Sequence, residues 1–271
     1  MKIKLFIIFA LLSEAEISAQ LKVTSVSPSA FYTYANYSDK STSNAVSLFT
    51  TATLNYKDYL SAGFDKQQIN SSNWKYNQQM LTIGGTKNLY PFYLGLFYSN
   101  IQGDYNSIPA GFNYTDKINL FDINLLFNYK LFYFGISGNY ISLKGFYNLS
   151  IKHYSAAIKK LIGIKFMLAA IFTQTVVSDN RNLSSIKLDI NYFLSNSLTI
   201  SGSTVLGNRA YYFDDELLSI FNQHETQKLN FSSTVKYSMI PNMSLILNYT
   251  YSDFSDYQIN YFVAGIKYII N

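Results

Sequence analysis

The residue pair best suited to chemistry is His153 and Ser155, which stand two positions apart in the sequence. In an extended strand this spacing places both side chains on one face, where an imidazole can take the proton of a hydroxyl and turn it into a nucleophile. The chain holds two histidines, and the second, His224, falls in a long connecting segment. A third group that would orient the imidazole is not evident beside the pair. We therefore expect His153 to be structural and the chain not to be an enzyme.

The other motifs of the sequence predict neither a cofactor nor a metal site. The chain has no Cys, which excludes Cys-ligated zinc and iron–sulfur sites. Gly84 and Gly85 lack the further glycines and the following helix of a phosphate-binding loop, and residues 214–216 lack the spaced ligands of a calcium loop. Lys and Arg number 21 against 16 Asp and Glu, and they are scattered along the chain. A nucleic-acid partner is therefore not expected.

The first residues have the layout of a secretory signal peptide. Lys2 and Lys4 precede an uninterrupted apolar run from Leu5 to Leu12, and a polar stretch then ends in Ala19. The apolar run is too short to cross a hydrocarbon layer, which takes about 20 residues in a helix. We expect residues 1–19 to be removed on export and residues 20–271 to form a single domain.

The chain has few charged residues for a soluble protein but no segment suited to a membrane helix, and the alternation of its apolar and polar residues explains both facts. Hydrophobic residues make up 48% of the chain and charged residues only 14%, against about 25% charged in a soluble domain. Yet no later segment is apolar for long enough to form a membrane helix. Apolar and polar side chains instead alternate strictly, as in residues 185–192. Such a segment is a strand with one apolar and one polar face.

Fourteen segments of this kind can be counted, at residues 29–38, 45–56, 59–68, 78–87, 91–101, 118–129, 132–141, 146–158, 162–176, 184–193, 198–207, 228–237, 243–252 and 258–270. An even number of alternating strands predicts an all-β fold, a closed antiparallel transmembrane β-barrel with apolar side chains toward lipid and hydrophilic ones inside. Residues 78–87 and 146–158 alternate least cleanly, so about 12 or 16 strands remain alternatives. A secreted soluble β-sandwich or periplasmic barrel is the competing fold, but its polar face would carry more Lys and Glu.

Connections and aromatic residues agree with the barrel. Short turns alternate in most places with longer connections, among them 69–77, 102–117 and 208–227, and in outer-membrane barrels the short turns are periplasmic. Aromatic residues near the short turns suit the bilayer–water boundary; they are Tyr56, Tyr59, Tyr90, Phe92, Tyr129, Phe132 and Tyr237. Interior glycines are expected to make room for aromatic side chains; they include Gly63, Gly95, Gly135 and Gly265.

The last strand carries a recognisable pattern. Gly265, Tyr268 and Ile270 stand at the offsets of the terminal assembly signal polar–x–Gly–x–x–aromatic–x–hydrophobic, with Val263 in the polar position and Asn271 beyond the usual end. The chain therefore resembles the general class of bacterial outer-membrane β-barrel proteins, small and porin-like, over its whole mature length. The resemblance implies location in the bacterial outer membrane, contact with its lipid and lipopolysaccharide, and insertion by the barrel-assembly machinery.

The pair His153 and Ser155 also resembles the His–x–Ser pair of outer-membrane phospholipases, in which the histidine activates the serine. That family continues with an Asn-Gly-Arg stretch, whereas Ala156, Ala157 and Ile158 follow here. A lipid hydrolase with its site on the barrel wall is therefore the last of three functional alternatives.

The first alternative is a narrow pore for small solutes, because fourteen strands lie between the filled barrels of about eight strands and the aqueous channels of about 16–18. Charges on the polar face would bias ion passage; those assigned to the lumen are Asp65, Asp122, Lys152, Lys165, Lys187, Asp189, Lys228, Lys236 and Lys267. Positive charges outnumber negative ones, which predicts a mild anion preference. Alternatively these groups pair inside a filled barrel, as Lys187 and Asp189 can.

The longest connection, 208–227, holds a second candidate site. Asp214 is suited to cap a short helix that begins at Asp215 and Glu216, with an apolar side that includes Leu217 and Phe221. This segment is expected to constrict the mouth, to dock a partner protein at the extracellular loops, or simply to pack on the rim. The second functional alternative is accordingly a non-conducting barrel that serves secretion, assembly or adhesion within a surface complex.

Overall fold

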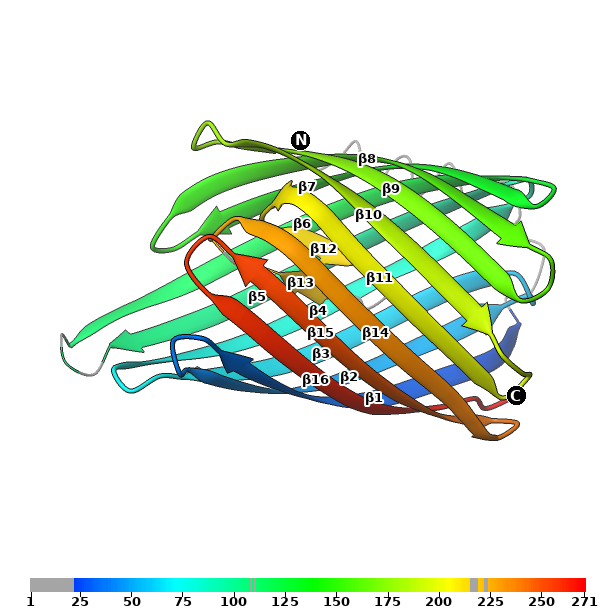
Figure 1. The fold of residues 1–271 in the computed structure, drawn as a ribbon, viewed down its shortest axis with the longest axis horizontal. Helices are drawn as coiled ribbons and strands as arrows, with labels where there is room; N and C mark the ends of the chain where they lie inside the picture. Colours follow the sequence, from blue (N-terminus) through cyan, green and yellow to red (C-terminus); the bar gives the residue numbers. More distant parts are fainter. Residues whose placement is uncertain (1–21, 108, 110, 215–218, 222–223) are drawn as a thin grey trace.

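The structure, a computed structural model, describes residues 22–107, 109, 111–214, 219–221 and 224–271. The predicted signal peptide, residues 1–19, lies outside these ranges. Fourteen long strands form one closed antiparallel barrel, and two short strands pair with each other in the connection between β11 and β14 (Figure 1). The strands are β1 (Val23–Tyr37), β2 (Thr42–Leu54), β3 (Asp58–Asn70), β4 (Trp74–Leu89), β5 (Phe92–Ser107), β6 (Phe112–Tyr129), β7 (Phe132–Lys144), β8 (Asn148–Ile162), β9 (Phe166–Val177), β10 (Asn182–Phe193), β11 (Leu198–Arg209), β12 (Tyr212–Asp214), β13 (Ser219–Phe221), β14 (Gln227–Ile240), β15 (Met243–Phe254) and β16 (Gln258–Tyr268).

The predicted closed barrel of fourteen strands is confirmed, but two predicted long connections are wrong. Most of 69–77 and 102–117 is strand, because β4, β5 and β6 run for 16, 16 and 18 residues. Figure 1 shows these strands projecting beyond their neighbours at the left. We call this end, where the connection 210–226 lies, the loop end. The opposite end, with turns such as 90–91 and 130–131, is the turn end.

Closure depends on the pairing of the first and last strands. β1 pairs with β2 on one side and with β16 on the other, from Ser29 opposite Lys267 to Tyr37 opposite Ile259. A further bridge joins Val26 and Ile270, each donating its N–H to the other's carbonyl at 2.8 Å. A closed ladder has no edge, so its strands can stand in hydrocarbon without unpaired backbone groups. Among the described residues, no helix is both long and apolar enough to cross a membrane.

The outer face of the barrel is apolar, as the two-residue period predicts. On β10, Ile186, Leu188 and Ile190 are 39%, 42% and 45% exposed and point outward, whereas Lys187 and Asp189 point into the lumen. Aromatic residues at the turn end are exposed; they include Tyr56, Tyr90, Tyr129 and Tyr237. Exposed apolar side chains in such number are stable only against lipid, so the barrel spans a membrane.

The interior at the loop end is apolar as well, which corrects the expectation of a hydrophilic inside. One buried cluster, the hairpin core, consists of Met80, Ile101, Ile118, Leu120, Ile141, Leu143, Ile151, Val177, Leu183, Ala210 and Tyr211. A second, the seam core, consists of Ala35, Tyr37, Ile69, Phe254, Ile259 and Tyr261. Nearly all of these residues lie in the strand halves nearest the loop end. Buried polar side chains such as Gln78, Thr175 and Ser252 lie between these clusters, and polar side chains dominate the lumen toward the turn end.

Two interior glycines hold aromatic rings, as predicted. Phe49 lies opposite Gly63, and Phe31 lies opposite Gly265 in the seam between β1 and β16. A Cβ at Gly265 would stand 2.0 Å from Cδ1 of Phe31, and the Phe31 and Phe49 rings are in contact at 5.9 Å between centroids. The same expectation is wrong for Gly95, which faces Asn124, and for Gly135, which faces Ala157 and Leu126.

We expect Gly265→Ala to destabilise the seam, because the added methyl must displace Phe31 and overpacking of this kind costs about 1–3 kcal/mol. The measurement is the temperature at which heat-modifiable gel migration is lost. Ala264→Val, on the outward face of the same strand, is the control and should leave this temperature unchanged. Adding Phe31→Ala should rescue Gly265→Ala, and additive losses in the double variant would contradict the proposed clash.

Candidate functional site

The connection between β11 and β14 folds into the barrel. β12 and β13 form a hairpin in which Tyr212 lies opposite Phe221, and Figure 1 shows it in yellow within the outline of the barrel. Ala210 and Tyr211, which lead into it, are 2% and 1% exposed and belong to the hairpin core with wall residues of β4–β10. The entry of the hairpin is therefore packed inside the barrel near the loop end.

The helix expected in this segment is wrong at residues 219–221, which are strand. Asp214 is the last residue of β12, and Ser219 pairs with it from β13, so both residues belong to a β-hairpin. Asp215, Glu216 and Leu217 lie outside the described residues, while Phe221 is the last residue of β13.

On the wall, His153 holds the entry of the hairpin. Its Nε2 is 2.7 Å from the Tyr211 carbonyl oxygen, and its Nδ1 is 2.7 Å from Oγ1 of Thr175. Because a carbonyl can only accept, Nε2 carries a hydrogen and donates it, and in the neutral ring Nδ1 accepts from the Thr175 hydroxyl. His153 is 2% exposed, so both hydrogen bonds are shielded from water.

Nearer the loop end, His224 completes the attachment. The hydroxyl of Tyr211 is 2.6 Å from Nδ1 of His224, whose ring stacks on Tyr147 at 4.2 Å between centroids. Arg181, in the connection between β9 and β10, donates from Nη1 to the His224 carbonyl at 2.7 Å. We call His153, Thr175, Tyr211, His224 and Arg181 the hairpin latch. Both histidines of the chain take part in it.

A charged pair beside the latch stabilises the position of Arg181 at neutral pH. Burial alone would raise the pKa of Asp179, but hydrogen bonds from Arg181 outweigh it and hold the pKa below its ordinary value. A depressed carboxylate pKa adds stability above the unfolded pKa of about 3.9, which is lost as the pH falls through the folded pKa. Burial raises the pKa of Tyr211 despite the nearby Arg181. Its hydroxyl therefore stays protonated and can donate to His224.

Below the hairpin, toward the turn end, lies a polar cavity of about 240 Å³, which we call the chamber. Tyr212 borders it from the hairpin, and Arg209 lies 3.5 Å from the centre of the Tyr212 ring. The wall of the chamber includes three cationic side chains, Lys159, Lys187 and Arg209, and one carboxylate, Asp122. Its volume is below the range of about 300–1,000 Å³ that is typical of drug-sized ligands. A volume of this size suits a small solute.

Of the nine charges assigned to the lumen, six face it; they are Asp65, Asp122, Lys187, Asp189, Lys236 and Lys267. Lys187 and Asp189 pair at 3.4 Å. The other three assignments are wrong. Lys152 points outward, since Ile151 and His153 beside it are buried inside; Lys165 lies in the turn after β8; and Lys228 is exposed at a bulge in β14.

The sequence analysis missed three inward charges, Asp116, Lys159 and Arg209. Lys159 was missed because the predicted strand ended at residue 158, whereas β8 continues to Ile162. Arg209 lies where the pairing of β11 and β14 is irregular, and its Nε donates to Oε1 of Gln227 at 2.5 Å. Asp116 lies near the loop end, in a stretch expected to be a loop.

The structure does not assemble the hydrolase pair. His153 and Ser155 both face the lumen, not lipid, and both ring nitrogens of His153 already have partners. The Ser155 hydroxyl is 3.2 Å from Oγ1 of Thr173 instead. Within the described ranges, no three His, Asp or Glu residues cluster in a way that could hold a metal ion.

The residues of the terminal signal take separate positions on β16 and after it. Gly265 faces the lumen beneath Phe31, whereas Tyr268 and Ile270 are 44% and 51% exposed on the outer side. Recognition by the assembly machinery remains a prediction.

A closed barrel with a lipid-facing exterior defines the class, a transmembrane β-barrel of the bacterial outer-membrane type. The fold is similar to CymD, a monoaromatic hydrocarbon channel, with a TM-score of 0.64, 9% identity, and 96% of this chain and 91% of that chain covered. It is also similar to a TodX monoaromatic hydrocarbon channel with the deltaS2S3 mutation, with a TM-score of 0.63, 11% identity, and 97% and 94% covered. The toluene transporter TodX of P. putida gives 0.55 at 8% identity, with 91% and 89% covered. Neither protein-family models nor curated protein sequences match the chain.

We expect His153→Leu to loosen the hairpin, because the buried Tyr211 carbonyl loses its donor at a cost of about 1–3 kcal/mol. Hydrogen–deuterium exchange of the backbone amides of residues 211–221, measured in detergent, should accelerate. Ser155→Ala is the matched control on the same strand face and should leave exchange unchanged. Equal exchange in His153→Leu and the wild type would show that the latch does not hold the hairpin.

Proposed function

We propose that the protein is a narrow outer-membrane pore for small solutes, with the hairpin of β12 and β13 as its gate. The observation that carries this proposal is the hairpin core, which fills the loop end of an otherwise polar lumen. A barrel of fourteen strands is wide enough for a narrow passage once this segment is withdrawn. The short-turn end is then periplasmic, as in outer-membrane barrels generally.

The gate is separable from the wall. β11 pairs with β14 from Leu198 opposite Tyr237 to Leu206 opposite Leu229, so the ladder closes without any help from the hairpin. What holds the hairpin inward is the latch and the apolar surface of Ala210 and Tyr211. Both can be lost without breaking a barrel hydrogen bond.

We propose a mild anion preference for the open pore. Inward cations in the described part of the wall are Lys159, Lys187, Arg209, Lys236 and Lys267, against the carboxylates Asp65, Asp116, Asp122 and Asp189. The overall excess is one positive charge, and the positive charges are concentrated in the chamber, where three cations face one carboxylate. Side-chain charges lining a passage bias ion passage in this way.

A second candidate solute class is apolar. The hairpin core and the seam core line the loop end with aliphatic and aromatic side chains, and the structures similar in fold include channels for monoaromatic hydrocarbons. A small apolar molecule would meet matching surface at the loop end. It would then have to cross the polar chamber, for which an anionic solute is better suited.

Replacing residues 212–221 by Gly-Ser-Gly should raise single-channel conductance in planar bilayers several-fold, because the obstruction at the loop end is removed. The wild type should open rarely. Shortening the connection 71–73, at the same end but outside the latch, is the control and should change little. If the replacement variant folds, as judged by heat-modifiable migration, and still does not conduct, the non-conducting surface barrel becomes the better account.

In the same replacement variant, reversal potentials under a KCl gradient should show anion preference. The replacement also removes Asp214, Asp215 and Glu216, so any contribution of these acids is absent. Lys159→Gln and Lys187→Gln should each shift the reversal potential toward cations, whereas Lys152→Gln, on the outward face of β8, should not. Clear cation preference of the replacement variant without the Lys substitutions would refute the anion preference. If the pore shows no ion selectivity but vesicles that contain it take up toluene, the apolar solute is favoured.

A further inference from the structure

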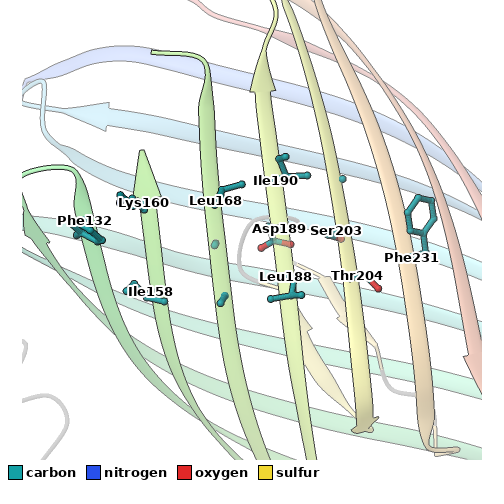
Figure 2. Close-up of a pocket in the computed structure, with 13 residues that line it drawn as sticks. Phe132, Ile158, Lys160, Leu168, Leu188, Asp189, Ile190, Ser203, Thr204 and Phe231 are labelled. Carbon is teal, nitrogen blue, oxygen red and sulfur yellow. The ribbon is translucent and has the colours of Figure 1, made fainter. Parts of the chain in front are cut away.

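The outer face of the barrel carries a hollow that the pore does not use. A groove of about 560 Å³ crosses β8–β11 and reaches β14, with Phe132 and Lys160 at one end and Phe231 at the other (Figure 2). Most of its lining side chains point outward and are apolar, among them Ile158, Leu168, Leu188 and Ile190. Asp189 also borders the groove, but its side chain lies on the lumen face with Lys187.

The hollow exists because two small residues interrupt the rows of large ones. Ala170 lies between Ile158 and Leu188 across the sheet, and Gly202 lies opposite Ile190. A Cβ at Gly202 would be 3.5 Å from Cγ2 of Ile190, an ordinary contact. No side chain of the described residues thus needs the space at Gly202, in contrast to Gly265, where Phe31 fills it. The space is available to a molecule from outside the chain.

Among the described residues, Lys160 is the one cationic side chain that lines the groove, and it lies near the turn end. Lys160 is three residues from the turn after β8, and its Nζ lies 4.8 Å from the centre of the Phe132 ring. The N–H of Leu161 donates to the Leu131 carbonyl at 2.9 Å, which brings the turn containing Lys130 alongside. The groove thus runs from a basic site at the depth of lipid headgroups into the hydrocarbon layer.

We propose that this groove binds one phospholipid of the leaflet at the turn end, with an acyl chain over Ala170 and Gly202 and the phosphate at Lys160. An acyl chain in the groove packs closely against the exposed Leu and Ile side chains and gains dispersion contacts that mobile lipid makes less well. A Lys near the membrane surface adds attraction for anionic headgroups. The inference requires the barrel to stand in a bilayer and is independent of conduction.

The test is a titration of the detergent-purified protein with dioleoyl phosphatidylglycerol, followed by native mass spectrometry of the bound lipid. Gly202→Leu and Ala170→Phe each fill the groove and should abolish the tightest-binding lipid. Lys160→Gln should weaken phosphatidylglycerol binding about fivefold and leave binding of dioleoyl phosphatidylcholine nearly unchanged. Ala62→Phe, on the outward face of β3 and outside the groove, is the matched control for added bulk.

Heat-modifiable migration identifies the variants that are folded. Because two different substitutions fill the groove, the proposal can still be tested if one of the variants fails to fold. Wild-type affinity in a folded groove-filling variant overturns the proposal, and so does an equal loss in Ala62→Phe. Loss of the lipid with unchanged single-channel conductance supports the site and leaves the pore proposal standing. A barrel that binds the lipid but never conducts would overturn the pore alone.

Discussion

The closed ladder of backbone hydrogen bonds is the constraint on which everything else in this structure depends. Hydrocarbon offers no partner to a free N–H or carbonyl, so the sheet must meet itself, and β1 meets β16 along a seam that ends with the bridge of Val26 and Ile270. Once the wall is closed, every side chain has only two destinations, lipid or lumen. The chemistry of the protein is decided by how the lumen is filled.

The two halves of the lumen differ in the polarity of the side chains that fill them. Toward the turn end, polar side chains and paired charges such as Lys187 and Asp189 line the space. Toward the loop end, the connection between β11 and β14 turns inward and buries apolar residues of the wall. Five latch residues then satisfy the polar groups that enter with it, since a buried carbonyl such as that of Tyr211 would otherwise lack a donor.

The barrel could be predicted from the sequence because alternation toward lipid is a local property of each strand. Its interior could not, because wall residues buried on both sides lose the alternation: Ile118 and Leu120 face the hairpin core, while Phe121 and Ile123 face lipid. Lys152 was assigned to the wrong face because the alternation predicted for β8 was shifted by one residue, and Lys228 because β14 has a bulge there. A shift or a bulge moves a side chain from one face of the strand to the other and leaves the amino-acid composition of the strand unchanged. The hydrogen bonds of the latch join residues 13 to 58 positions apart, such as Tyr211 with His224 and His153 with Tyr211, and no local pattern in the sequence records such contacts.

The direct pairing of β11 with β14 has a consequence for the order of assembly. The fourteen strands can pair with their neighbours before the segment between β11 and β14 has folded, because no strand pairing of the barrel includes that segment. The hairpin can then enter a finished cylinder from its open mouth. The length and composition of residues 210–226 can consequently change without affecting insertion of the barrel into the membrane. The same barrel can therefore carry different inward-folded segments.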